Sequence, residues 1–319
     1  MRVGIVDELA SDEFFYPIFP LRSPDMPALR SIATAFAAVL AILTTVLIQP
    51  ASADLAYGIT NNQFLVSWNT NTPGTLNSGF ALSGLQANEQ IVGIDFRPAN
   101  NALYGIGSTN RLYQINTETG AASQIGSQFA LPLNGSQFGY DFNPVIDRSR
   151  IDSDTNKNYV IHPDTGGQTQ VTDLFFNSGD PNFGKDPNIV HIGYTNSFAG
   201  TGSTQLYGID SGLDILVTQA NSAGTLGTVG SLGLDITGVG GFDISGTSGI
   251  AYGAFLANGS SQSSFYSVNL VTGQSTLIGQ IGGGLQITAF SLSAVPEPSS
   301  LIGLAGFGLL GFAGRRRRR

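Results

Sequence analysis

The feature that most constrains the fold is a pattern of short apolar runs that recurs along the chain. Its clearest copy, residues 103–126, reads LYGIGSTNRLYQINTETGAASQIG. Turn-forming Gly, Asn and Thr separate three apolar runs, which is typical of antiparallel strands joined by hairpin turns. Weaker copies begin at Ala56, Leu206 and Ala251. The chain therefore repeats one small unit of strands.

A further apolar run precedes the repeat and carries Gly-x-Asp-Phe or a remnant of it, as in Ile91–Pro98 and Phe138–Pro144. This run is the first-type strand of a unit of four, and the three runs of the repeat that follow it are the second-, third- and fourth-type strands. The units recur about every 45–57 residues, a spacing typical of propellers of four-stranded blades. The sequence therefore predicts an all-β fold, a β-propeller of about five four-stranded blades.

The order of strands within the repeat predicts how the propeller closes. The repeat region begins with a second-type strand, Ala56–Thr60, and ends with a first-type strand, Ile287–Leu292. The last strand would then complete the blade that the first strand opens, which removes the open edge of a linear array. A linear β-solenoid is the alternative, but that fold does not require the chain to begin and end at different strands of the repeat.

Composition excludes several function classes. The chain of 319 residues has no cysteine, so disulfides, thiolate metal sites and thiol nucleophiles are absent. Its net charge is −8, although five arginines end the sequence at Arg315–Arg319. The remainder is therefore strongly acidic and would be repelled by nucleic acid, so we expect no nucleic-acid partner.

The two histidines fall at structural positions of the repeat. His162 replaces an Asn that begins equivalent turns at Asn116 and Asn269, each closed by a glycine that supplies positive φ. His191 lies within an apolar strand. No Ser-His-Asp arrangement or histidine metal cluster follows. The sequence therefore predicts no catalytic residue and favours a non-enzymatic protein.

Three carboxylates share one position of the first-type strand: Asp95, Asp141 and Asp243. If this strand lines the propeller axis, the three side chains gather around the channel and could bind a hard cation such as calcium, the one candidate cofactor. The alternative is that each buried Asp accepts hydrogen bonds from the backbone of a neighbouring blade. We favour this alternative, because the motif is absent from two of the five units.

Two further segments are weaker candidates for binding. Asp152–Asn158 begins like a calcium loop, but it lacks the central Gly and has Pro163 where the final Glu belongs. Phe175–Asn188 is an insertion with two acidic residues, Asp180 and Asp186. Long loops on a rigid scaffold often carry binding sites, so this insertion is where we expect a ligand contact if one exists.

The N-terminal region has the pattern of a secretory signal. Arg30 precedes an apolar stretch, and Ala51-Ser-Ala53 follows it as an A-x-A cleavage site, so residues 26–53 are predicted to be a helical signal peptide. An uncleaved anchor is the alternative, because the apolar stretch is long. Residues 1–25 are acidic, and we interpret them as an extension wrongly included before a true start at Met26. The predicted domain is then 54–293.

The C-terminal segment, 294–319, has three parts in order. Pro296-Glu297-Pro298 is followed by an apolar, Gly-rich stretch of about 16 residues, predicted to be a transmembrane helix, and then by Arg315, Arg316, Arg317, Arg318 and Arg319. The arginines would stay on the cytoplasmic side of a membrane. This segment resembles the PEP-CTERM sorting signal of Gram-negative bacteria. The resemblance implies recognition by an exosortase, removal of the tail near the motif, and a final place at the cell surface or outside the cell. A plain membrane anchor is the alternative.

The repeat region resembles an exported bacterial family whose domain has no known function, on sequences such as GIDFRPANNALYGIGSTNRLYQINTETGAASQIG and LYGIDSGLDILVTQ. Two function classes remain. The first is a non-catalytic binding or structural propeller at the cell surface or in the extracellular matrix, linked to exopolysaccharide and biofilm. The second is a metal-dependent hydrolase or lactonase that uses the channel carboxylates.

Overall fold

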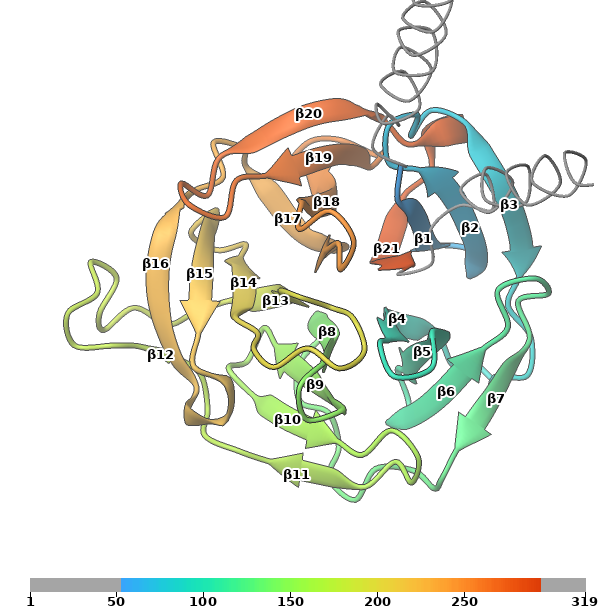
Figure 1. The fold of residues 1–319 in the computed structure, drawn as a ribbon, viewed down its shortest axis with the longest axis horizontal. Coiled ribbons are helices and arrows are strands. Elements are labelled where there is room, and N and C mark those ends of the chain that lie inside the picture. Colours follow the sequence, from blue (N-terminus) through green and yellow to red (C-terminus); the bar gives the residue numbers. More distant parts are fainter. Residues whose placement is uncertain (1–52, 294–319) are drawn as a thin grey trace, which may run out of the picture. The chain divides into compact units, whose positions relative to one another are not determined.

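The computed structural model describes residues 53–293, which form five β-sheets arranged as blades around a central channel (Figure 1). Blade 1 contains β21 (Ile287–Ser293), β1 (Leu55–Thr60), β2 (Phe64–Asn69) and β3 (Leu76–Ala81), from the channel outward. Blade 2 contains β4 (Ile91–Arg97), β5 (Ala102–Gly107), β6 (Arg111–Ile115) and β7 (Ala122–Ile125). The prediction of a five-bladed propeller is confirmed.

The other three blades follow in chain order around the ring. Blade 3 contains β8 (Phe138–Asn143), β9 (Arg148–Ser153), β10 (Asn158–Ile161) and β11 (Gln168–Gln170). Blade 4 contains β13 (Ile189–Tyr194), β14 (Leu206–Asp210), β15 (Ile215–Gln219), β16 (Thr225–Ser231) and, outermost, β12 (Phe175–Phe176). Blade 5 contains β17 (Ile236–Ile244), β18 (Ala251–Ala257), β19 (Ser264–Val268) and β20 (Ser275–Gln280). Two short 3₁₀ turns lie at Asn221–Ala223 and Gly282–Gly284.

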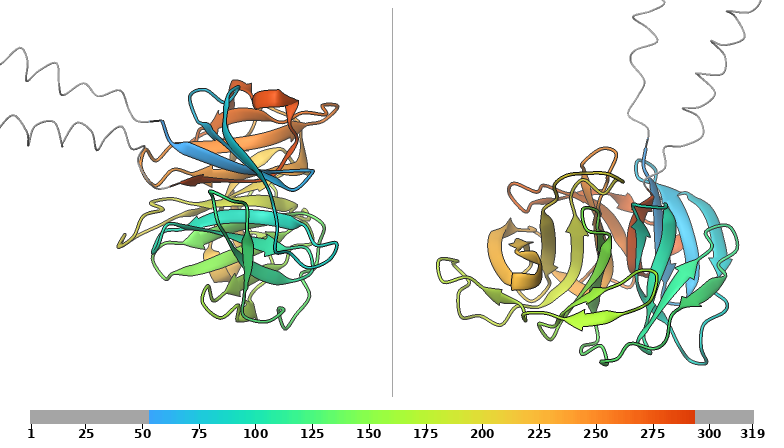
Figure 2. Two further views of the ribbon diagram at one scale, coloured as in Figure 1. Left: turned by 90° about the vertical axis from the view of Figure 1, so that its right-hand side faces the viewer. Right: turned by 60° about the horizontal axis from the view of Figure 1, so that its bottom comes forward.

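The ring closes as the repeat order predicts. The last strand, β21, pairs antiparallel with the first, β1, in a register that sets Leu55 opposite Ser293 and Ile59 opposite Ala289. Blade 1 therefore combines the two ends of the described chain, and the predicted closure is confirmed over a linear solenoid. The two ends lie side by side on one face of the propeller (Figure 2).

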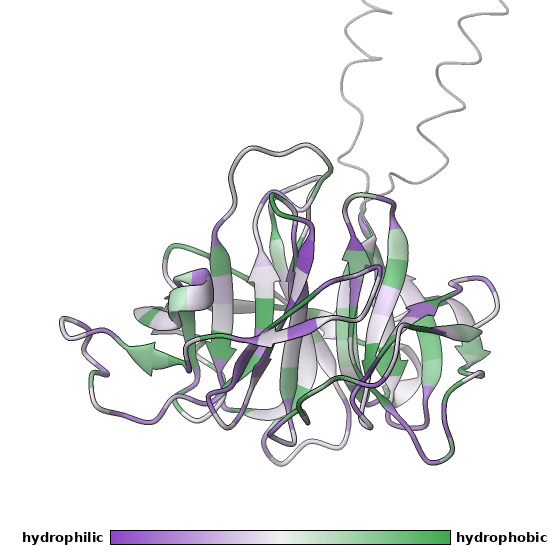
Figure 3. Ribbon diagram, turned by 90° about the horizontal axis from the view of Figure 1, so that it is seen from below, coloured by the Kyte–Doolittle hydropathy of each residue, from purple (hydrophilic) through white to green (hydrophobic). Residues whose placement is uncertain are grey.

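The hydrophobic core is divided among the spaces between blades. Apolar residues concentrate in the strands, and polar residues in the loops (Figure 3). Between blades 1 and 5, for example, Trp68 stacks on Phe290 at 5.8 Å between ring centroids and meets the edge of Phe265 at 5.7 Å. Each blade thus buries both of its faces against neighbours, which is why its strands carry apolar side chains on both sides.

The predicted turn chemistry is also confirmed. Gly120, Gly166 and Gly273 have φ of 73°, 70° and 81°, where residues other than glycine are strained. The Asn116 side chain accepts a hydrogen bond from the Glu118 N–H at 2.9 Å. His162 Nδ1 accepts one from the Asp164 N–H at 3.2 Å in the same way. His162 is therefore a turn residue, as its sequence position indicates.

One segment differs from expectation. The insertion 175–188, predicted to be a loop, begins with the short strand β12, which pairs parallel with β16 and adds a fifth strand to blade 4. The cause is burial, because Phe176 is 2% exposed and packs with Leu226 in the blade 4 core. No helix among residues 53–293 is long and apolar enough to span a membrane. The predicted signal and sorting helices lie outside the described residues.

Candidate binding site in the propeller channel

The innermost strands approach one another so closely that glycine is required between them. A Cβ added to Gly241 of β17 would lie 2.6 Å from Phe290 N on β21. One added to Gly139 of β8 would lie 2.9 Å from Ile192 N on β13. Real Cβ atoms cannot approach so closely. The Gly of the Gly-x-Asp-Phe pattern therefore has a packing role, and it keeps the channel narrow.

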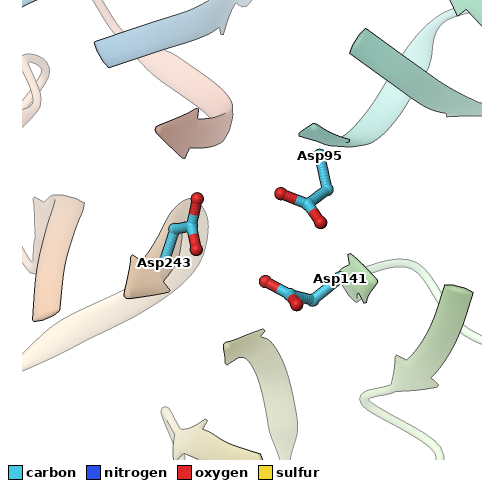
Figure 4. A group of neighbouring side chains, drawn as sticks. All are labelled: Asp95, Asp141 and Asp243. Carbon is cyan, nitrogen blue, oxygen red and sulfur yellow. The ribbon is translucent and has the colours of Figure 1, made fainter. Parts of the chain in front are cut away.

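The Asp of the same pattern faces the channel, as the sequence predicts. Asp95 on β4, Asp141 on β8 and Asp243 on β17 converge, with one carboxylate oxygen of each within 4.8 Å of the others (Figure 4). All three are at most 4% exposed. We call these three residues the acidic ring. Among the described residues it is the only group of this kind with metal-binding spacing.

Hydrogen bonds tie each member of the acidic ring to the next inner strand. Asp95 accepts from the Phe142 N–H at 2.7 Å, and Asp141 accepts from the Tyr194 N–H at 3.3 Å. Asp243 accepts from the Leu292 N–H at 2.7 Å. On β21, Ser291 takes the position of the Asp. Its hydroxyl donates to Asp95 at 2.7 Å and accepts from the Phe96 N–H at 3.3 Å. Side chains thus link blade to blade, as the hydrogen-bonding alternative predicts.

Burial also sets the ionisation of the acidic ring. Desolvation, together with the charge of Asp243, raises the pKa of Asp95 well above its usual range. Desolvation and the charges of the other two carboxylates raise the pKa of Asp141 in the same direction. Desolvation raises the pKa of Asp243 to about 6. No basic side chain hydrogen-bonds to any of the three within the described structure, so the ring favours a bound proton or a cation over free negative charge.

The chemistry open to the acidic ring is limited by burial, because its three carboxylates are at most 4% exposed. The adjoining channel cavity, whose walls include Gly93, Gly139 and Phe290 but none of the three carboxylates, has a volume of ≈ 10 Å³. That is room for about one water molecule. The oxygens are the ligand type that calcium prefers, and their separation suits one ion.

His191 breaks the pattern of the inner strands. It stands on β13 where Gly139 and Gly241 stand on their strands, and Gly193 takes the position of the Asp. The imidazole stacks on Phe255 at 5.9 Å between centroids, and burial lowers its pKa to about 3. His191 is therefore neutral at physiological pH and packs in the core, as expected from its strand.

The two weaker candidates do not join the channel. Asp152 is buried on β9, while Asp154 accepts hydrogen bonds from Ser136 at the β9–β10 turn, so the suspected calcium loop has its carboxylates apart. In the insertion, Asp180 accepts from the Thr228 backbone and hydroxyl and is occupied in fixing the loop to β16. The insertion protrudes at the outer rim (Figure 1).

A site that the sequence did not reveal lies at the channel mouth where the inner strands begin. It is a pocket of ≈ 210 Å³ with polar but uncharged side chains, which we call the mouth pocket. Its polar walls come from Asn61, Gln63, Gln90, Ser136, Gln137 and Thr288. A glutamine stands directly before three of the inner strands, at 90, 137 and 286, but this spacing does not distinguish the two that line the pocket.

The amides of the mouth pocket differ in what they bind. Gln63 Oε1 accepts from the Ile91 N–H at 2.7 Å, which fixes that side chain to the scaffold. The side-chain amides of Gln90 and Gln137 have no hydrogen-bond partner in the described part of the chain. Phe138 adds an apolar surface beside them. The mouth pocket thus presents free donors and acceptors next to an aromatic ring.

Fold and channel together define a closed five-bladed β-propeller with a buried acidic ring. The chain belongs to the DUF4394 family, a domain of unknown function, whose model matches residues 64–291. The PEP-CTERM protein-sorting motif matches residues 294–318. Both resemblances noted in the sequence are confirmed, and the motif implies an exported, membrane-anchored precursor that an exosortase processes.

The solved structures that match the chain are distant in sequence. A chain of a nidogen/laminin complex is 11% identical with a TM-score of 0.44, and the match covers 76% of this chain and 98% of that one. A protein of unknown function from Bacteroides thetaiotaomicron is 12% identical with a TM-score of 0.45, covering 75% and 64%. Glutaminyl cyclase from Myxococcus xanthus is 11% identical with a TM-score of 0.40, covering 65% and 94%. No curated protein matches the chain at a significant level.

Proposed function

We propose that this propeller is a non-catalytic binding protein of the cell surface or extracellular matrix, and that its mouth pocket binds a neutral exopolysaccharide. The observation that supports this proposal is the unpartnered amides of Gln90 and Gln137 in an uncharged pocket of ≈ 210 Å³. Sugar hydroxyls donate and accept hydrogen bonds without carrying charge. An amide can serve both functions at once.

The size and position of the mouth pocket suit a saccharide. Its volume accommodates about one or two sugar rings, and the mouth is open to solvent, so a longer polymer can continue past it. Phe138 supplies the apolar face on which a sugar ring can pack. The carboxylates of the acidic ring, by contrast, are at most 4% exposed, and this burial favours a binding role at the mouth over hydrolysis in the channel.

The test is a binding measurement with purified neutral exopolysaccharide from an exosortase-containing host. We expect binding to weaken about ten-fold or more in the double variant Gln90→Ala/Gln137→Ala, because each lost hydrogen bond contributes about 1 kcal/mol. Gln114→Ala is the matched control, because Gln114 is exposed on β6 outside the mouth pocket.

Two results would count against the proposal. One is equal affinity in the double variant and the wild type. The other is binding of acidic polysaccharide alone, since the uncharged mouth pocket offers nothing to prefer it. Calorimetry measures both, and circular dichroism confirms that each variant is folded.

A further inference from the structure

The face of the propeller on which the described chain begins and ends has a composition of its own. The last inner strand, β21, ends at this face beside the start of β1. Equivalent residues on successive inner strands hydrogen-bond to one another, so the other inner strands also end at this face. The loops that follow them, 98–101, 144–147, 195–205 and 245–250, therefore share it with the two chain ends (Figure 2). Ser248 confirms this, since its hydroxyl donates to Asp54 at 2.9 Å. We call this the terminal face.

Exposed apolar side chains gather on the terminal face. Val145, Ile146, Phe198 and Ile250 are between 44% and 55% exposed, and they come from the inner loops of three consecutive blades. The loops of blades 4 and 5 touch, because a Cβ on Gly246 would lie 2.1 Å from Ser197 O. Phe198 and Ile250 therefore lie in adjoining loops, and Val145 and Ile146 come from the inner loop of the next blade.

The same loops are almost without charge. Asp147 is the one charged residue in the four loops. It is paired with Arg97, whose guanidinium lies 2.5 Å from its carboxylate. At the opposite face, the loops between second and third strands carry Asp154, Lys157 and Asp214. The four inner loops thus carry almost no charge, whereas the loops between third and fourth strands, farther out on the same face, carry the exposed Glu118 and Asp164.

The covalent chain holds this face close to the sorting motif. Ser293 is the last residue of β21 and pairs with Leu55, and the matched motif begins at residue 294. The apolar stretch begins at residue 299, six residues beyond Ser293, and six extended residues span at most about 21 Å. The surface that holds the apolar stretch 299–314 in the precursor therefore lies within reach of the terminal face.

We propose that the terminal face rests on the lipid surface in the tail-bearing precursor, with Phe198 and Ile250 inserted at the level of the lipid headgroups. The inner loops have apolar tips and almost no charge, so they have little cost of desolvation against lipid. The short connection raises the effective concentration of the surface, so a contact too weak to bind free vesicles is still formed.

This orientation has two consequences. Because the four loops contain no basic residue, contact does not need anionic lipid. The mouth pocket lies at the other end of the channel and points away from the membrane, toward the extracellular matrix. The exosortase itself is the other candidate for contact with the terminal face, and the experiment below distinguishes contact with the exosortase from contact with lipid.

The absence of cysteine makes the contact directly measurable. We would introduce Phe198→Cys or Ile250→Cys into the full chain, attach an environment-sensitive fluorophore, and reconstitute the protein in phosphatidylcholine vesicles with a quencher at the headgroup level. Ser261→Cys is the matched control, because Ser261 is an exposed residue of a loop at the opposite face.

We expect quenching about two-fold or more stronger at positions 198 and 250 than at 261, with no increase when anionic phosphatidylglycerol is added. Equal quenching at the three positions would overturn the proposal. So would protection of position 198 only in vesicles that also contain an exosortase, because the occupant would then be a protein. The chosen positions are exposed, so the variants retain the fold, which circular dichroism verifies.

Discussion

Replacing Asp141 by Asn should stabilise the propeller at neutral pH and reduce the dependence of its stability on pH. The carboxylate faces two others, and desolvation plus their charges raise its pKa well above the usual range. Asn keeps the oxygen that accepts from the Tyr194 N–H and loses the charge. An acid whose pKa is raised by folding favours the folded state below its unfolded pKa, and this contribution is lost as the pH rises through the folded pKa.

The magnitude follows from the neighbouring carboxylate. The pKa of Asp243 rises from 3.8 to about 6 on folding. A shift of about two units corresponds to about 3 kcal/mol of unfolding free energy lost between pH 4 and pH 8 from this residue alone. In Asp141→Asn one source of repulsion is absent, so we expect a gain of about 1–3 kcal/mol at pH 8 and almost none at pH 4.

The assay is denaturant unfolding of the propeller at several pH values with a chelator present. Asp152, whose pKa burial raises to about 6, contributes equally to both proteins, so their difference isolates the acidic ring. Glu118→Gln is the control, since it removes an exposed charge and should change stability by less than about 0.5 kcal/mol. An Asp141→Asn protein less stable than wild type at pH 8 would refute the electrostatic reasoning.

Two further results are expected. If the acidic ring binds calcium, millimolar calcium should raise the melting temperature of the wild type and leave Asp141→Asn less affected; a midpoint that calcium does not move in either protein would count against a metal site. Gly241→Ala should cost about 1–3 kcal/mol of unfolding free energy, because its Cβ would lie 2.6 Å from Phe290 on β21. Gly202→Ala, which meets nothing within 4 Å, is its control, and similar losses in the two variants would contradict the packing argument.

The parts of the fold that repeat could be predicted from the sequence. The shared position of Asp95, Asp141 and Asp243 in the repeat was enough to place them around one axis, because equivalent strands of a propeller are related by rotation. The offset between first and last strands predicted closure for the same reason. Both inferences needed only the period of the pattern and no knowledge of side-chain contacts.

The parts that do not repeat could not be predicted. The strand β12 forms because Phe176 is buried against blade 4 and its backbone meets the free edge of β16, a contact between segments about fifty residues apart. The mouth pocket depends on Gln90 and Gln137 from different blades and on the fact that neither amide bonds to the scaffold. Such pairings are tertiary, and local propensity carries no information about them.

The pairing of β21 with β1 also sets an order of events in time. The three strands β1–β3 leave the membrane first in an N-to-C export, yet their blade stays incomplete until the last strand arrives. Contacts between chain ends are slow to form, because a long loop must close first. Since the motif begins at residue 294, a cut beyond Ser293 leaves the finished ring intact, whereas a cut even a few residues earlier would remove part of its closing strand.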